Sequence, residues 1–448
     1  MPGLRVNRLL DWKRRFAWVA LVLAACVPPG VVLSEIATRG VNVPFADQWL
    51  RGSTLDVASR TLTGTLSRRD LLRQNFDHRI FFSHLTTAVL VRFSSWDQRD
   101  EMRLSVLMAA VAVVLLFVAW KKGAPPHALP WVLPVFSLLM LSQRQRANWL
   151  WGFQTQWYFA LLFVAALAAL LSVSRLRTRH WVLGAIGATC ATFSFGSGLL
   201  TWPLFVLGAV LRGEMTWRRA IGWLVAAVTV LVVFFQRYNW MPRPGRPLSL
   251  SWALDTAQFV FAFVGSSFAP ESAAGLPWAM AAGVVVLALA LLATLLLWRG
   301  GALRESVPWL FLLGFAVGSA LMASQSERGR AVANALFSRN VAHACLAAVA
   351  ALVLTGQAAK RLSPSKAWLL RLAPALWIPG FVWATQASWT PYPFIGDRAL
   401  FDCVQAFPKL RNLSCLGVTG EFVEDADNVS KTLLLLSEHR KGPYAEGR

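Results

Sequence analysis

Long apolar runs separated by short polar loops dominate the pattern along this chain. The first run, Phe16–Leu33, follows a cluster of basic residues, which is the arrangement that opens a signal peptide. The run is longer than an ordinary signal-peptide core, and no small-residue cleavage motif follows it. The pattern therefore predicts a membrane anchor that is retained.

The later apolar runs are each roughly long enough to cross a hydrocarbon core of about 30 Å. They are Met102–Trp120, Leu129–Leu141, Trp157–Val173, Trp181–Phe193, Leu199–Leu211, Ala220–Phe235, Leu276–Trp298, Val307–Ala323, Val341–Leu354 and Ala367–Ala384. With the first run they predict an all-α polytopic membrane protein with about eleven transmembrane helices. Two shorter stretches, Ile80–Phe93 and Phe259–Pro270, are predicted to be interfacial or re-entrant helices. A crossing at either one alone would move every later loop to the other side.

Basic residues gather in alternate loops between these runs, on the same side as the basic N-terminal segment. They are Lys121, Lys122, Arg175, Arg177, Arg179, Arg212, Arg218, Arg219, Arg299, Arg304, Lys360, Arg361 and Lys366. Loops rich in Lys and Arg stay in the cytoplasm, so this side is predicted to be cytoplasmic. The long loop Ser34–Glu101 and the C-terminal tail then lie outside. We expect a bundle over residues 1–386 and a small external tail over 387–448.

The overall composition agrees with a membrane protein. Of 448 residues, 56% are hydrophobic and only 15% are charged, which excludes a disordered or ordinary soluble chain. The net charge of +22 indicates cytoplasmic loops and contact with anionic membrane lipid; no nucleic-acid partner is expected. The 22 Trp residues are typical of aromatic belts at the two membrane interfaces.

Cysteine positions fit this topology. Cys403 and Cys415 lie in the external tail, where an oxidising compartment of a Gram-negative cell would let them form a disulfide. No His/Cys cluster has metal-ligand spacing, so no metal ligand is predicted, and a need for a divalent metal stays open. Motifs for nucleotide binding or soluble-type hydrolysis are also absent from the sequence.

The first outer loop carries the acid that we single out. Its apolar residues recur at helical spacing, which predicts helices along the membrane surface, and Ser67 with Asp70 resembles a capping box. Asp47 follows Pro44 by about one turn. Aromatic, partly dehydrated surroundings raise the pKa of a carboxylate and suit it to accept a proton at neutral pH. A helix-capping or Arg-paired role is the alternative for Asp47.

Other polar residues are concentrated on the same outer face. The outer loops after the first contain Arg144, Arg146, Arg237, Arg243, Arg246, Arg328, Arg330 and Arg339, with Glu327 as their acid. Arg grips phosphate oxygens through paired hydrogen bonds, so these loops predict a pocket for a lipid-linked phosphate or diphosphate. Contact with lipid headgroups is the alternative.

Further candidates for substrate contact lie nearby in the sequence. Asp77, His78 and Arg79 would end a surface helix at the mouth of the bundle, with a solvated face as the alternative. Asn148, Trp151 and Gln154 are predicted to contact a sugar, because amides bond hydroxyl groups and an indole face stacks on a pyranose; interfacial packing is the alternative. They are substrate-binding candidates.

The predicted spans themselves are almost free of ionisable groups. His343 and Arg371 are the exceptions, and both lie near span ends, where we expect them to snorkel or to cap a helix. An ion-coupled transporter would place such groups near the bilayer midplane. The pattern therefore favours a function on the outer surface.

Several local strings carry a family resemblance. Pro44-Phe45 before Asp47-Gln48-Trp49, then Asp77-His78-Arg79-Ile80, Asn148–Gln154 and Gly198–Pro203 resemble a group of uncharacterised bacterial multi-spanning proteins. The whole arrangement resembles the GT-C superfamily of membrane glycosyltransferases, whose protein mannosyltransferase and aminoarabinose transferase branches are the nearest well-known relatives.

The resemblance implies a polyprenyl-phosphate sugar donor, inversion at the anomeric centre and an early acid in the first outer loop as general base. That role falls on Asp47. The mannosyltransferase branch has adjacent acids in this loop, whereas Ala46 and Gln48 flank Asp47 here, and the closer group usually has Glu where this chain has Asp77.

The sequence thus predicts a glycosyltransferase of a bacterial inner membrane, with its N-terminus in the cytoplasm and its C-terminus in the periplasm. It would move a sugar to a glycan, lipid or protein acceptor on the periplasmic side. A flippase or other transporter of lipid-linked saccharides, and a polysaccharide polymerase or ligase, are the alternatives.

Overall fold

The computed structural model describes residues 2–124, 128–240, 249–326, 331–389, 398–410 and 426–445. These residues are almost entirely helical. Their one sheet is an antiparallel hairpin of β1 (Gln74–Asn75) and β2 (His78–Arg79). The prediction of an all-α polytopic membrane protein is confirmed.

Eight helical segments in the described residues are long and apolar enough to cross a membrane. They are formed by α1 (Pro2–Arg39), α5 (Gln98–Gly123), α8 (Thr155–Leu171) with η3 (Gly152–Gln154), α11 (Trp217–Phe235), α13 (Gly275–Arg299), α14 (Leu303–Ser324), α15 (Ser338–Ala359), and the joined α16 (Pro364–Leu372), η8 (Ala373–Trp377) and α17 (Ile378–Ala387). Each coincides with a predicted span.

The other three predicted spans coincide with shorter helices. These are α6 (Val132–Met140), α9 (Thr178–Thr192) and α10 (Thr201–Leu211). At 1.5 Å per residue, α6 is about 13 Å long, less than half a hydrocarbon core. Of the two stretches predicted to be interfacial or re-entrant, Ile80–Phe93 coincides with the helix α4 (Phe81–Phe93). The other, Phe259–Pro270, covers only the end of the longer helix α12 (Leu250–Gly265) and the turn after it.

Short helical segments also occur between the longer helices. They are η1 (Ala46–Trp49), η2 (Gln143–Gln145), α7 (Arg146–Trp149), η4 (Gly196–Leu200), η5 (Ser266–Phe268) and η7 (Val332–Leu336).

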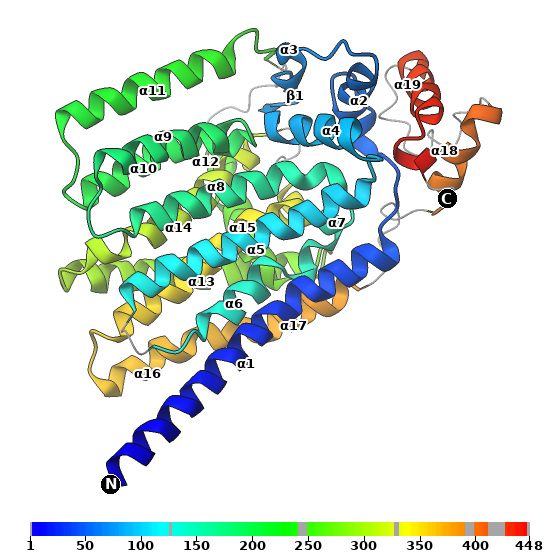
Figure 1. Cartoon of the computed structure of the whole chain (residues 1–448). Coiled ribbons are helices and arrows are strands. Elements are labelled where there is room, and N and C mark those ends of the chain that lie inside the picture. Colours follow the sequence, from blue (N-terminus) through cyan, green and yellow to red (C-terminus); the bar gives the residue numbers. More distant parts are fainter. Residues whose placement is uncertain are drawn as a thin grey trace.

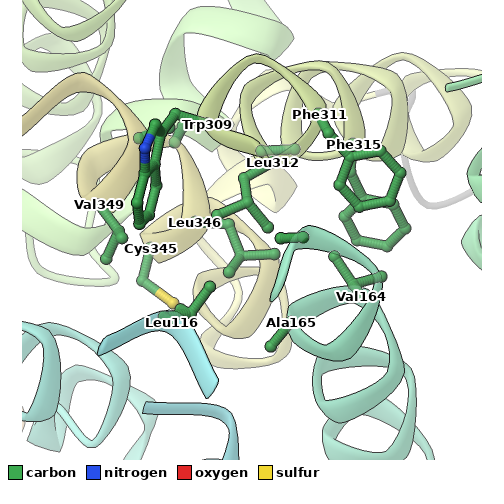
Figure 2. Close-up of a cluster of buried hydrophobic side chains, with 14 of the residues drawn as sticks. Leu116, Val164, Ala165, Trp309, Phe311, Leu312, Phe315, Cys345, Leu346 and Val349 are labelled. Atoms are coloured by element: carbon green, nitrogen blue, oxygen red, sulfur yellow. The ribbon is translucent and has the colours of Figure 1, made fainter. Parts of the chain in front are cut away.

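The core of the bundle is built around α15. In its most apolar 18-residue window, 89% of residues are buried, against 6% in α1 and 17% in α11. Figure 2 shows Cys345, Leu346 and Val349 of α15 packed against side chains of α5, α8 and α14. Alanine recurs along α15, and small residues let neighbouring helices approach closely. In α11, by contrast, Leu224, Val225 and Val232 are exposed, as expected of a lipid-facing helix.

Several basic loops meet at one end of the bundle. Glu214 Oε1 accepts hydrogen bonds from Arg212 Nη2 and Arg304 Nη2, both at 2.8 Å. Both guanidinium groups also donate to the Ser174 carbonyl, at 3.3 and 3.2 Å. Arg361 Nη2 lies 3.9 Å from Glu305 Oε2. The loops after α8, α10, α13 and α15 therefore lie together.

The opposite end carries the first loop and the C-terminal segment. The loop contains α2 (Thr54–Leu62) and α3 (Arg68–Leu71), and the C-terminal segment contains α18 (Arg398–Leu410), α19 (Ala426–Glu438) and η10 (Gly442–Ala445). At the right of Figure 1, α19 lies beside α2, and the two helices are in contact. We call these elements, with η1, the hairpin and α4, the outer cap.

Shared packing joins the two parts of the outer cap. Trp49, Leu55 and Trp96 belong to one hydrophobic cluster with Phe401 and Leu433. Hydrogen bonds add to it: the Asn42 side chain donates to the Gly442 carbonyl at 2.8 Å, and the Asn428 amide donates to Asp56 Oδ1 at 2.5 Å. The C-terminal segment thus packs onto the first loop as one unit.

Two local predictions fall within the outer cap. Ser67 and Asp70 form the expected capping box at the start of α3, where Ser67 N–H donates to Asp70 Oδ2 at 2.9 Å. Cys403 lies in α18, but Cys415 lies outside the described residues. Their disulfide stays a prediction.

Candidate functional site

A cavity of about 730 Å³ lies where the outer cap meets the bundle. Its lining comes from η1, the hairpin, η3, α8, η4, the end of α11, α12, α14, η7 and α15. Among the residues that the sequence predicts to bind substrate or to act in catalysis, five line it: Asp47, Asp77, His78, Gln154 and Arg339. Residues from distant parts of the chain thus line one cavity.

Asp47 is held in η1 by the residue after it. The side chain of Asp47 is only 9% exposed. Gln48 Oε1 accepts from Phe45 N–H at 3.0 Å and from Trp151 Nε1 at 3.1 Å, while Gln48 Nε2 donates to Gln98 Oε1 at 2.9 Å. The fully buried Gln48 amide therefore fixes the turn that carries Asp47.

Asp77 and His78 lie on the β1–β2 hairpin, so the prediction that they end a surface helix is wrong. Its tip is tied to the segment after α11, because Tyr238 Oη donates to the Asp77 carbonyl at 3.1 Å. Gln74 and Asn239 exchange two further hydrogen bonds, at 2.8 and 2.9 Å. The hairpin and the end of α11 thus form one rim of the cavity.

Backbone strain recurs around the cavity. Ala46, Phe76 and Arg237 have φ of 45°, 48° and 53°, the left-handed region that side chains with a Cβ rarely adopt. Each directly precedes a residue that lines the cavity, namely Asp47, Asp77 and Tyr238. Such conformations cost roughly 1–3 kcal/mol each and persist where surrounding structure enforces them. The chain therefore spends stability in orienting these residues.

Aromatic rings form a continuous column along the cavity wall. The ring of His78 lies 3.9 Å from that of Phe195, which lies 4.0 Å from Trp157, and Trp157 lies 4.8 Å from His343, measured between centroids. Gly196 N–H donates to His78 Nδ1 at 3.3 Å. A Cβ at Gly196 would lie 2.6 Å from that nitrogen, so the close approach needs glycine.

Several buried polar atoms at the cavity have no hydrogen-bond partner within the described residues. They are Gln154 Oε1, Gln156 Oε1, Ser197 Oγ, Ser319 Oγ and both ring nitrogens of His343. The expectation that His343 snorkels or caps a helix is wrong, because its side chain is fully buried among aromatic rings. Gln156, Ser197 and Ser319 gave no signal in the sequence, since isolated neutral residues in apolar surroundings resemble ordinary core.

Three of the arginines predicted to bind substrate form hydrogen bonds or ion pairs within the protein, namely Arg144, Arg146 and Arg79. Arg144 Nε donates to the Ala269 carbonyl at 2.7 Å, and its Nη1 lies 3.4 Å from Glu271 Oε2. Arg146 pairs with the buried carboxylate of Glu35.

Arg79 caps the C-terminal end of α11. Its Nε and Nη2 donate to the carbonyls of Phe234 and Gln236, both at 2.5 Å. Burial lowers the pKa of the Arg79 guanidinium below its ordinary value. This side chain holds the rim of the cavity in place.

The remaining candidates lie elsewhere or outside the described residues. Asn148 donates to the Ser338 carbonyl at 3.0 Å, and Trp151 packs edge-on against Phe45 and bonds to Gln48; within the described lining of the cavity neither is present. Arg237 is exposed. The predictions for Arg243, Arg246, Arg328 and Arg330 fall outside the described residues. Within the described ranges, no three His, Cys, Asp or Glu side chains gather as a metal site.

Comparison with known proteins gives little beyond the fold class. No protein-family model matches the chain, and no curated protein matches it. A solved structure of the archaeal oligosaccharyltransferase AglB from Archaeoglobus fulgidus, in complex with an inhibitory peptide and a dolichol-phosphate, aligns with 93% of this chain at a TM-score of 0.48 and 11% identity. The chain spans 61% of the length of AglB. The helices and the cavity define a multi-pass membrane protein with a cavity of mixed polar and apolar lining at one end.

Proposed function

We propose that this protein is an integral membrane glycosyltransferase of the GT-C type, which moves a sugar from a polyprenyl-phosphate donor to an acceptor hydroxyl. The observation that carries the proposal is the composition of the cavity. It combines two carboxylates, Asp47 and Asp77, with one arginine, Arg339, neutral amides and an aromatic wall. Sugar-phosphate recognition needs these groups together.

Asp47 acts as the general base in this proposal. The acceptor oxygen attacks the anomeric carbon, the bond from that carbon to the phosphate oxygen breaks, and Asp47 accepts the acceptor proton. Arg339, half-buried at the start of α15, donates to the phosphate and offsets the charge left on the departing polyprenyl phosphate. The burial of Asp47 and its rigid turn support this assignment.

The apolar part of the cavity suits the lipid. Phe235, Trp240, Phe259, Phe263 and Met322 line it together with the polar groups. A donor with a hydrocarbon tail and a polar head matches a lining of this mixed character.

The reaction belongs on the outer face of the membrane in this proposal. The cavity is at the end opposite the basic loops around Glu214, and loops rich in Arg and Lys face the cytoplasm. In a bacterial inner membrane this face is periplasmic. The acceptor is a glycan, a lipid or a protein.

The test is transfer of labelled sugar from a polyprenyl-phosphate donor to membrane acceptors, using the full chain in nanodiscs. Asp47→Asn keeps the shape and removes the proton acceptor, so transfer slows by about 10²–10⁴-fold while donor binding survives. Asp100→Asn is the control, because Asp100 is paired at the surface with Arg103 at 2.7 Å. Transfer that persists undiminished in Asp47→Asn contradicts the assignment and moves the role to Asp77.

If the protein is instead a transporter, the same assay and variant should give different results. It would move lipid-linked cargo without detectable transfer by the wild type, and Asp47→Asn would leave movement unchanged. That pair of results would replace the proposed enzyme by the flippase.

A further inference from the structure

The lining of the cavity includes five buried, neutral polar side chains, which we call the polar floor: Gln154, Gln156, Ser197, Ser319 and His343. They come from η3, α8, η4, α14 and α15. Each side chain is at least nine-tenths buried. Five separate elements of the fold thus contribute buried polar groups to one cavity.

Unpartnered polar atoms make the polar floor costly. Six of its atoms have no hydrogen-bond partner within the described residues. A buried donor or acceptor left unsatisfied costs roughly 1–3 kcal/mol, and native proteins contain few. Such a concentration at one cavity indicates groups that a bound molecule satisfies.

The available hydrogen-bond types match hydroxyl groups. The free atoms of Gln154 and Gln156 are carbonyl oxygens, which accept. Ser197 and Ser319 both donate and accept, and a neutral imidazole such as His343 offers one donor and one acceptor. A ligand that forms hydrogen bonds with all of these atoms must carry several groups, such as hydroxyls, that can each donate and accept.

Aromatic rings stand beside these polar atoms. Trp157, Phe195 and Phe315 surround His343, with ring centroids 4.8, 5.9 and 5.1 Å from it. Apolar faces beside hydrogen-bonding edges are the complement of a sugar ring, whose faces are C–H and whose edges are hydroxyl.

The distribution of charge around the cavity indicates an uncharged ring at the polar floor. None of the five residues of the polar floor has a carboxylate, ammonium or guanidinium group, whereas Asp47, Asp77 and Arg339 line the cavity from η1, the hairpin and the first turn of α15. A charged substituent in the polar floor would lose its hydration without gaining a counter-charge there. Arg339 and His343 lie four residues apart on α15, about 6 Å along its axis, so a ring attached to a phosphate at Arg339 reaches the polar floor.

We propose that the polar floor binds the sugar ring of the donor and selects an uncharged ring over uronic acids and amino sugars. The inference rests on the proposed function, because it takes the donor phosphate to be held at Arg339. It assigns Gln156, Ser197, Ser319 and His343 as specificity residues.

Binding of short lipid phosphates to the full chain in nanodiscs tests the proposal. The probes are farnesyl phosphate alone and farnesyl phosphate carrying glucose, galactose or mannose, each beside its uronic acid and its 2-amino sugar. At least one neutral sugar should tighten binding tenfold or more over farnesyl phosphate, and its charged analogues should not.

Two variants test whether the polar floor causes the gain in affinity that the sugar brings. Ser319→Ala and Gln156→Leu should each reduce the sugar-dependent gain by about 2- to 12-fold, the range for one neutral hydrogen bond, and leave farnesyl phosphate binding unchanged. Gln357→Leu is the matched control: it removes an amide near the far end of α15, where Gln357 accepts from Ser306 at 3.0 Å.

The outcomes separate this proposal from the proposed function. Equal binding of neutral and charged sugars, or an unchanged gain in both variants, overturns the polar floor as a sugar site. Absence of farnesyl phosphate binding overturns the phosphate site instead. In that case, hexyl glycosides of the same neutral sugars and of their uronic acids test whether the polar floor binds a sugar. A preference for the neutral glycosides that both variants lose supports the sugar site. Equal binding of neutral and charged glycosides refutes it.

Discussion

The two ends of the bundle are both rich in arginine and treat their polar groups in opposite ways. At the end with the basic loops, Arg212 and Arg304 converge on Glu214, and the carbonyl of Ser174 accepts from both. At the cavity, buried oxygens and nitrogens of the polar floor have no partner within the described residues. One end is closed by its own hydrogen bonds, whereas the other keeps hydrogen-bonding capacity for a ligand.

The arginines at the cavity end also differ from one another in what surrounds them. Arg144 and Arg146 follow the pattern of the basic end, because Glu271 and Glu35 pair with them. Arg339 lines the cavity instead. A cluster of arginines in the sequence is therefore a mixture of structural residues and candidate ligand contacts.

The largest expected effect is an all-or-none difference in accessibility between the two ends. Arg92→Cys, at the exposed end of α4, should react in whole cells with a maleimide that cannot cross the membrane, whereas Lys122→Cys, exposed at the inner end of α5, should not. Labelling is counted against the unsubstituted chain, which contains Cys26, Cys190 and Cys345 as free thiols. The reverse pattern would invert the orientation of both ends.

A second expectation concerns the closed end. Glu214→Gln should lower the free energy of unfolding by about 3–5 kcal/mol, because it leaves the buried charge of Arg212 without its partner. Glu305→Gln is the control, since Glu305 is 69% exposed and 3.9 Å from Arg361, and it should cost less than about 1 kcal/mol. Thermal unfolding of the full chain in nanodiscs measures both.

The loss in Glu214→Gln should also depend on pH. Burial opposes the charge of Glu214, but hydrogen bonds from the Leu176 amide and Arg212, with the charge of Arg212, outweigh it and lower its pKa below 4.5. A lowered pKa stabilises the fold above pH 4.5, and this contribution disappears as the pH falls through the folded-state value. The gap between wild type and variant should be constant from pH 7 to pH 5.5 and should narrow below pH 4.5. A gap that stays constant down to pH 3.5 would mean that the charge of Glu214 is not the cause.

The smallest expected effect separates the two kinds of arginine at the cavity end. Arg339→Ala should weaken binding of farnesyl phosphate by about 1.5–3 kcal/mol, the range for a hydrogen bond to a charged group. Arg144→Ala should leave that binding unchanged and should lower thermal stability, because it removes the bonds from Arg144 to Glu271 and to the Ala269 carbonyl. A binding titration and a melting curve on both variants measure this, and matching behaviour of the two would remove the distinction.

Much of the fold was predictable from the sequence. The apolar runs predicted the helices, since burying apolar side chains in lipid needs no knowledge of which helix is the neighbour. The basic loops predicted which segments lie at the same end. Asp47, Asp77, His78, Gln154 and Arg339 were candidate site residues in the predicted outer loops, and all five line the cavity.

The sequence could not tell which of the arginines line the cavity. The pairing of Arg144 with Glu271 joins residues more than a hundred positions apart, and a change of helix packing would break it. It also could not show that the C-terminal segment completes the outer cap, because the cluster of Trp49, Leu55 and Phe401 forms only when both ends of the chain meet.

Local composition alone determined that this chain is a helical membrane protein with polar chemistry at one end, because hydropathy and charge act residue by residue. Tertiary structure decided which polar atoms are satisfied. Ser319 and His343 are ordinary residues of apolar helices until α8, η4, α14 and α15 come together and bury both at the cavity, with polar atoms that have no partner within the described residues. Hydrogen bonding is a relation between atoms that the fold brings together, so it is set by packing and not by sequence pattern.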